Sequence, residues 1–275
     1  MPNSLFDQKR NCRPLLLGTA LLILIGFSSC RSIPFVPFVK KSDGEIQNLP
    51  VKRALPASRA KKPKGPPIAR SQVIATAQAY HSHPWSPTER NAFHGLDKSG
   101  IQVDTPDKNF QRAGTDPGWW KVGQKNYGIP YQWGGFSSLS EFDRGIQSGK
   151  YAGDVYTKDK RKQLDKAVSK QAVGVDCSGF VSRCLGLTRS YSTRDLPGIC
   201  TPLMNIKFLL PGDILNAYNS HVILFYQFAD KQYRDILGYE VGAPPTWKVA
   251  LNRTPVSLLL ALGFKPYRYN QIVDG

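Results

Sequence analysis

The sequence predicts an α+β fold in which N-terminal helices pack on an antiparallel β-sheet. Two observations support this prediction. Helical periodicity and helix-start signals lie between residues 71 and 186, whereas the β-favouring apolar segments come after residue 212. Helices followed by a run of strands are typical of a layered α+β domain. No internal repeat is present, and 275 residues leave room for one such domain with extensions.

The first helices are predicted from side-chain spacing and capping signals. A helix starts at Ser71, because four apolar residues share one side at helical spacing: Val73, Ile74, Ala77 and Tyr80. The segment Ser86-Pro87-Thr88-Glu89 has the pattern of a capping box with proline at the first helical position, which predicts a second helix ending near Gly95. Residues 96–118 lack periodicity and are predicted to be loop.

The later elements are one more helix and a group of strands. Lys158–Ala172 is predicted to be an exposed amphipathic helix, with an apolar side made of Leu164, Ala167, Val168 and Ala172. Apolar, β-favouring segments bounded by turn residues predict four strands: Asp213–Tyr218, His221–Phe228, Tyr233–Val241 and Phe264–Tyr269.

The positive charge of the chain is concentrated near its N-terminus. The formal net charge is +17, and residues 31–70 alone carry ten basic and two acidic residues. A nucleic-acid groove on the folded part is therefore poorly supported, and we expect no nucleic-acid partner. Attraction of the tail to anionic lipid or to a cell-wall polymer is the more natural interpretation.

The first 29 residues have the pattern of an export signal. Lys9, Arg10 and Arg13 precede an uncharged segment, Pro14–Phe27, that is rich in Leu and Ile. This segment of about 14 residues is shorter than the roughly 20 needed to cross a bilayer, which favours a signal peptide.

The signal peptide is followed by a cysteine in a distinctive context. Phe27-Ser28-Ser29-Cys30 resembles a bacterial lipobox, in which the cysteine is acylated, although Phe27 stands where Leu is usual. The alternative is an ordinary signal peptide with an unrelated cysteine. Acylation of Cys30 would hold the exported protein on a membrane. Seven prolines and scattered Lys then predict a disordered basic tether over residues 30–70, followed by a helical N-terminal extension over 71–117.

The segment Val175–Val181 carries the strongest chemical signal. Asp176 can cap a helix whose apolar stripe (Phe180, Val181, Cys184 and Leu185) ends at Gly186. This cap puts Cys177 in the first turn, where unpaired N–H groups and the helix dipole favour a thiolate. Cys184 lies deeper in the helix and is interpreted as core. The plain alternative for Cys177 is a small buried cysteine.

Four segments together resemble the NlpC/P60 family of papain-like cell-wall cysteine peptidases. They occur in the family's order: Tyr131-Gln132-Trp133-Gly134-Gly135, Asp176-Cys177-Ser178-Gly179-Phe180-Val181, Leu210-Pro211-Gly212-Asp213-Ile214 and His221-Val222. The match covers about residues 118–245 and implies a papain-like catalytic domain over 118–275. One departure is an insertion, residues 136–172, where family members usually have a short loop. This insertion is expected to reshape or cover the cleft.

The resemblance assigns His221 as the general base for Cys177. The remaining histidines (His81, His83 and His94) have no partner cluster for a metal, so surface or capping roles are expected. No metal or organic cofactor is implied. If Asp230-Lys231 forms a two-residue hairpin turn, Glu240 lies directly opposite His221 and can orient its ring. A one-residue change in turn length would put Tyr239 or Val241 there instead.

The resemblance also assigns substrate contacts. The Tyr131 hydroxyl and the backbone N–H of Cys177 would polarise the substrate carbonyl, and Asp176 with Ser178 would hold a free amine of the substrate. Trp133 is assigned to substrate binding as well. The alternative is that Tyr131 and Trp133 are aromatic core beside a glycine turn, and that the other two residues act only as caps.

The resemblance implies an exported, lipid-anchored cysteine endopeptidase that hydrolyses peptidoglycan stem peptides. The expected bond joins D-glutamate, through its γ-carboxyl, to a diamino acid. Two other functions remain open: a non-catalytic wall-binding lipoprotein, and an amidase or acyltransferase that uses the same residues. A Cys184–Cys200 disulfide is compatible with an oxidising compartment, but the pairing does not follow from the sequence.

Overall fold

The computed structural model describes residues 65–111, 117–242 and 247–274, which belong to one compact unit. The α-helices of these residues are α1 (Arg70–Ser82), α2 (Leu139–Gln147), α3 (Lys158–Gln163), α4 (Cys177–Cys184) and α5 (Val256–Ala261). Short 3₁₀ turns are η1 (Glu89–Asn91), η2 (Leu164–Ala167), η3 (Leu196–Ile199) and η4 (Ile206–Phe208). None of the helices in this described part has the length and hydrophobicity of a membrane span.

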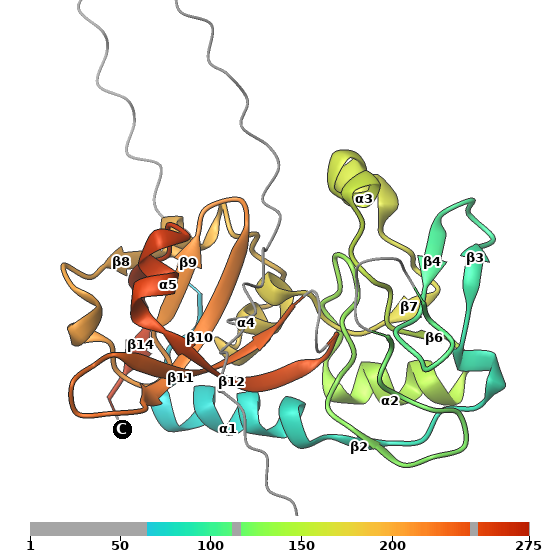
Figure 1. The fold of residues 1–275 in the computed structure, drawn as a ribbon, viewed down its shortest axis with the longest axis horizontal. Coiled ribbons are helices and arrows are strands. Elements are labelled where there is room, and N and C mark those ends of the chain that lie inside the picture. The colour runs from blue at the N-terminus through green and yellow to red at the C-terminus, as the bar shows by residue number, and fades with distance from the viewer. Residues whose placement is uncertain (1–64, 112–116, 243–246, 275) are drawn as a thin grey trace, which may run out of the picture. The chain divides into compact units, whose positions relative to one another are not determined.

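A six-stranded sheet with the order β12-β11-β10-β9-β13-β8 forms the centre of the fold (Figure 1). All neighbouring strands in it are antiparallel. Its strands are β8 (Cys200–Pro202), β9 (Ile214–Ala217), β10 (His221–Phe228), β11 (Asp235–Val241), β12 (Val249–Pro255) and β13 (Lys265–Tyr269). Together with the helices, this sheet confirms the predicted α+β class.

Eight shorter strands form two-stranded pairs around this sheet. They are β1 (Ile68–Ala69) with β14 (Ile272–Val273), β2 (Pro84–Trp85) with β5 (Asn126–Tyr127), β3 (His94–Leu96) with β4 (Gln102–Asp104), and β6 (Tyr151–Ala152) with β7 (Ala172–Val173).

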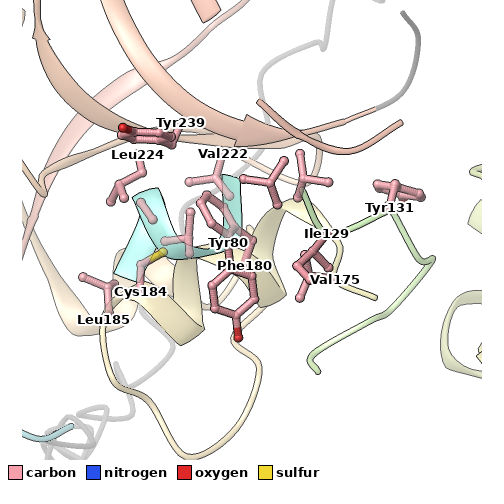
Figure 2. Close-up of a cluster of buried hydrophobic side chains, with 14 of the residues drawn as sticks. Tyr80, Ile129, Tyr131, Val175, Phe180, Cys184, Leu185, Val222, Leu224 and Tyr239 are labelled. Carbon is pink, nitrogen blue, oxygen red and sulfur yellow. The ribbon is translucent and has the colours of Figure 1, made fainter. Parts of the chain in front are cut away.

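The predicted N-terminal helices cover one face of the sheet. Helix α4 packs against β10 and β11, and α1 packs against α4. Figure 2 shows the resulting core, in which Phe180 of α4 lies between Tyr80 of α1 and Val222 of β10. The rings of Tyr80 and Phe180 meet edge to face with centroids 5.8 Å apart. The stripe predicted for α4 is fully buried, so this packing fixes where the N-terminus of α4 lies.

The second face of the sheet is covered by α5 and η4, which the sequence analysis did not predict. Leu215, Ile223 and Phe225 point to this face, where Leu259 of α5 and Ile206 of η4 pack on them. Burial on both faces explains why His221–Phe228 is almost continuously apolar rather than alternating.

The predicted strands agree with β9, β10, β11 and β13 within two residues at each end. Strands β8 and β12 were not predicted. Only the first two residues of β12 are buried, and Asn252 and Arg253 follow them, so the segment lacks the apolar pattern of a strand. Its pairing with β11 holds it in place instead.

Two predictions for residues 86–118 are wrong. The capping residue is Thr88 rather than Ser86, its box partner is Asn91, and the turn stops after three residues as η1. The chain then leaves the helical path because the backbones of Phe93 and Thr105 bond to each other, which starts the β3–β4 hairpin in place of the predicted loop.

The predicted helix over Lys158–Ala172 is also wrong in part. It breaks at Leu164, whose φ of 54° is incompatible with a continuous helix, and continues as η2 and then β7. Lys160 anchors α3 directly before this break, because its ammonium group is buried against the Asp154 carboxylate and the Gln102 carbonyl. Helix α2 was missed, although Ser138 and Glu141 form a capping box at its start.

The folded unit begins earlier than the predicted end of the tether. Ile68 and Ala69 form β1, and Arg70 is the first residue of α1. The Arg70 guanidinium bonds to the fully buried carboxylate of Asp213 at 2.9 Å, and Arg268 bonds to the same carboxylate at 2.7 Å. Asp213 therefore ties α1 to the sheet. The signal peptide and residues 30–64 of the predicted tether, Cys30 among them, lie outside the described residues.

Replacing Asp213 by Ala is expected to lower the free energy of unfolding by about 3 kcal/mol, because it leaves two arginines without their buried partner. Urea denaturation measures the change. The control is Asp159→Ala, which removes an exposed partner of Lys162 and should leave the unfolding midpoint almost unchanged. Equal, small effects of the two substitutions would contradict the anchoring role of Asp213.

Candidate active site

Cys177 is the first residue of α4, as predicted. The Asp176 carboxylate caps the helix: it accepts the Gly179 N–H at 2.6 Å and the Ser178 hydroxyl at 2.9 Å. Burial raises the pKa of Asp176 even though these hydrogen bonds favour its charged form. Cys177 is half-buried at the N-terminus of α4.

A close backbone approach explains the glycine two residues after the thiol. A Cβ atom on Gly179 would lie 2.0 Å from the carbonyl oxygen of Gly135, and that oxygen also accepts the Asp176 N–H. The segment 131–135 and the start of α4 are therefore held together through backbone atoms. Only glycine permits this approach.

The His221 ring lies between the thiol and a carboxylate. Its Nε2 atom is 2.6 Å from Oε2 of Glu240, and Cys177 is the second side chain with which the ring interacts. Burial lowers the pKa of His221, but the hydrogen bonds with Cys177 and Glu240 outweigh burial and raise it to about 10. The arrangement therefore favours an imidazolium at neutral pH.

Glu240 is held in its charged form by a further residue. Its Oε1 atom accepts a hydrogen bond of 2.8 Å from the Asn252 side chain. Burial raises the pKa of Glu240, but the hydrogen bonds with His221 and Asn252 and the charge of His221 lower it overall. Sequence reasoning missed Asn252 because strand β12 was not recognised.

The predicted contact between His221 and Glu240 is present, although the predicted hairpin register is wrong. The Asp230 carboxylate accepts backbone N–H groups of Gln232 and Arg234, which makes the connection longer than two residues. Phe228 pairs with Ile236, three residues away from the predicted register, and a shift of three would put Glu240 on the wrong face.

A β-bulge returns the Glu240 side chain to the face of the sheet on which His221 lies. The register changes between Phe225 and Gln227, so Leu224 pairs with Tyr239, two residues from the predicted register. An even shift keeps side chains on the same face. Continued along β11, this register places Glu240 opposite Ile223 and one diagonal step from His221, within reach of its ring.

Tyr131 lies beside the thiol in a buried position. Its backbone N–H donates to the Trp247 carbonyl, and the residue bridges to Val175, directly before the α4 cap. Burial raises the pKa of Tyr131 well above its ordinary value, and the nearby charges of Asp176 and Cys177 add to this effect. The hydroxyl therefore stays protonated and able to donate.

These residues line one cleft of about 590 Å³. Tyr131, Trp133, Asp176 and Ser178 lie along it with Cys177, His221 and Glu240, so the structure brings together all the predicted site residues within its described part. The Ser178 hydroxyl is engaged with Asp176 rather than directed to an open position. The other histidines bond to the Val249 carbonyl (His81), Asp143 (His83) and Asp107 (His94), and none of them lines this cleft.

The insertion forms one wall of the cleft. Tyr156, Arg161, Leu164, Asp165 and Val168 line it, and the Trp133 indole donates to the Leu164 carbonyl at 3.2 Å. Sequence analysis predicted that the insertion would reshape the cleft but identified none of these residues. The break at Leu164, where α3 gives way to η2, has no local sequence signal.

Cys184 and Cys200 are both buried, and no disulfide joins them.

Comparisons with protein-family models, curated proteins and solved structures find no match to this chain.

Replacing Glu240 by Gln is expected to lower the pKa of His221 from about 10, because the neutral amide removes a charge that favours the imidazolium. NMR titration of the imidazole signals measures this. The wild-type pKa lies above 6.5, so the associated stabilisation is fully present below pH 6.5 and is lost as the pH rises through about 10. The stability gap between wild type and variant should shrink over that interval.

Asp143→Asn is the matched control, because Asp143 is an acidic partner of a different histidine, His83. This variant should leave the His221 titration unchanged. An identical His221 midpoint in wild type and Glu240→Gln would show that the carboxylate does not control the ring.

Proposed function

We propose that this protein is a cysteine hydrolase with the papain-like fold of the NlpC/P60 family. The observation that carries the proposal is the hydrogen-bonded series Cys177–His221–Glu240 in a cleft, with the thiol at a helix N-terminus. A nucleophile, a base and a group that orients the base are the elements of covalent acyl transfer. Three of the four sequence segments that resemble the family, those that contain Tyr131, Cys177 and His221, contribute residues to this cleft.

In the proposed mechanism, the Cys177 thiolate attacks the carbonyl carbon of an amide. The Tyr131 hydroxyl and the backbone N–H of Cys177 stabilise the oxyanion. The His221 imidazolium gives its proton to the nitrogen as the C–N bond breaks, which leaves a thioester on Cys177. Water then attacks the thioester while His221 takes a proton from it. Cleavage of the C–S bond restores the thiolate and the imidazolium.

The proposed substrates are peptidoglycan stem peptides, cut between γ-linked D-glutamate and a diamino acid. The sequence resemblance supports this choice, and so does the acidic side chain of Asp176, which lines the cleft and suits a substrate amine. An acylated Cys30 and the basic segment that follows it would hold the enzyme on a membrane facing the cell wall.

Cys177→Ala is expected to abolish release of stem-peptide fragments from purified sacculi, because it removes the sulfur that forms the thioester in the proposed mechanism. Mass spectrometry of the soluble products measures the release. Cys184→Ala is the control: it also removes a thiol from α4, but from the buried core, and should keep the activity at some cost in stability. Undiminished release by Cys177→Ala would refute the proposal.

His221→Ala is expected to slow alkylation of Cys177 by iodoacetamide about tenfold at pH 7, because the thiolate loses the imidazolium beside it. Mass spectrometry of the labelled peptide gives the rate. His83→Ala is the control, since His83 lies outside the cleft. If wild type and His221→Ala both react as slowly as free cysteine, the chain is better described as a wall-binding protein that does not turn over.

A further inference from the structure

The wall contributed by the insertion is firmly anchored. We call residues Lys158–Ala167, which comprise α3 and η2, the strap. The Lys160 ammonium holds it at one point through the buried Asp154 carboxylate, and the Trp133 indole holds it at another through the Leu164 carbonyl. These two contacts hold the strap along one side of the cleft.

One of these side chains reaches across to the turn that precedes His221. Nη2 of Arg161 donates to the backbone carbonyl and to the side-chain oxygen of Asn219, the latter at 2.7 Å. Asn219 adopts a left-handed φ of 55°, which asparagine tolerates well, and it lies two residues before His221. A guanidinium has five N–H donors, so Nη1 and Nε of Arg161 remain for a ligand.

A second arginine lines the same end of the cleft. Arg194 directly follows Thr193, and the Thr193 carbonyl accepts a hydrogen bond from the side-chain amide of Asn216. Asn216 lies near the end of β9, just before the β9–β10 turn that contains Asn219. The Arg194 side chain is exposed to the cleft and forms no ion pair within the described part of the chain. Asp165 of the strap also lines the cleft, but it forms no ion pair with either arginine.

The position of His221 decides which part of a substrate meets these arginines. The imidazolium must protonate the leaving nitrogen, so the leaving amine lies against the ring. The rest of the leaving group then lies next to the turn at Asn219 and the segment that carries Arg194. Paired guanidinium groups fit a carboxylate through charge-assisted, bidentate hydrogen bonds.

We propose that Arg194 and Arg161 form a subsite for a carboxylate on the leaving amine. This inference rests on the proposed function, since it uses His221 as the acid that protonates the amine. The preferred substrates then release an amino acid with a free carboxylate rather than one whose carboxyl is blocked as an amide. The strap supplies half of the subsite, which gives the insertion a role in substrate choice.

The test uses two synthetic γ-D-glutamyl–diamino acid substrates that differ at one group. In one the leaving diamino acid has a free α-carboxylate, and in the other this group is a carboxamide. Wild type should cleave the carboxylate substrate with the higher kcat/KM. Arg194→Gln should raise KM for it about tenfold, with kcat and the carboxamide kinetics nearly unchanged, since a charge-assisted contact is lost. Arg194→Lys should retain part of the preference.

Arg189→Gln is the matched control, because Arg189 belongs to the same connection but stacks on Tyr191 and does not line the cleft. It should behave like wild type. Equal kcat/KM values of wild type for the two substrates, or equal losses on both in Arg194→Gln, would overturn the subsite.

A binding measurement separates the subsite from the reaction. Calorimetric titration of Cys177→Ala with the free diamino acid should show binding that weakens about tenfold when Arg194→Gln is added. If binding weakens in this way but wild type cleaves neither substrate, the result would support the subsite and refute the hydrolase. Binding unaffected by Arg194→Gln, beside normal cleavage, would refute only the subsite.

Discussion

The site depends on one imidazole that contacts a thiol on one side and a carboxylate on the other. Cys177 comes from α4, and His221 and Glu240 come from adjacent strands. The pairing requires that α4 be seated on β10 and β11, which the buried side chains around Phe180 achieve. Core packing and chemistry are therefore coupled, because the same helix that buries Phe180 carries the thiol.

The electrostatics of the site follow from this burial. Desolvation by itself would make both His221 and Glu240 neutral, yet each favours the charged form of the other. Asn252 satisfies the second oxygen of the carboxylate, so no charged oxygen lies buried without a donor. The hydrogen bonds from Asn252 to Glu240 and between Glu240 and His221 fix the orientation of the imidazole ring. A ring held in this way suits proton transfer better than a mobile histidine would.

The insertion adds to this frame without disturbing it. It is tied to the N-terminal part of the chain through Lys160 and Gln102, and to the segment that directly precedes the insertion through Trp133 and Leu164. Its elements lie beside the β3–β4 hairpin (Figure 1). Because Arg161 then bonds to the turn at Asn219, the strap bridges two sides of the cleft and contributes chemistry that the shared motif lacks.

The sequence by itself determined what is local: the cap at Asp176, the thiol in the first turn of α4, the buried stripe around Phe180 and four strands of the sheet. Helical periodicity, strand periodicity and capping depend on residues a few positions apart, so they can be predicted from the sequence alone. Tertiary structure decided the rest. Three cleft residues were not predicted: Asn252 lies on the edge strand β12, Arg161 on α3, and Arg194 on the connection that follows α4. Glu240 faces His221 only because a bulge cancels an odd register shift, and such compensation between distant irregularities leaves no local signal.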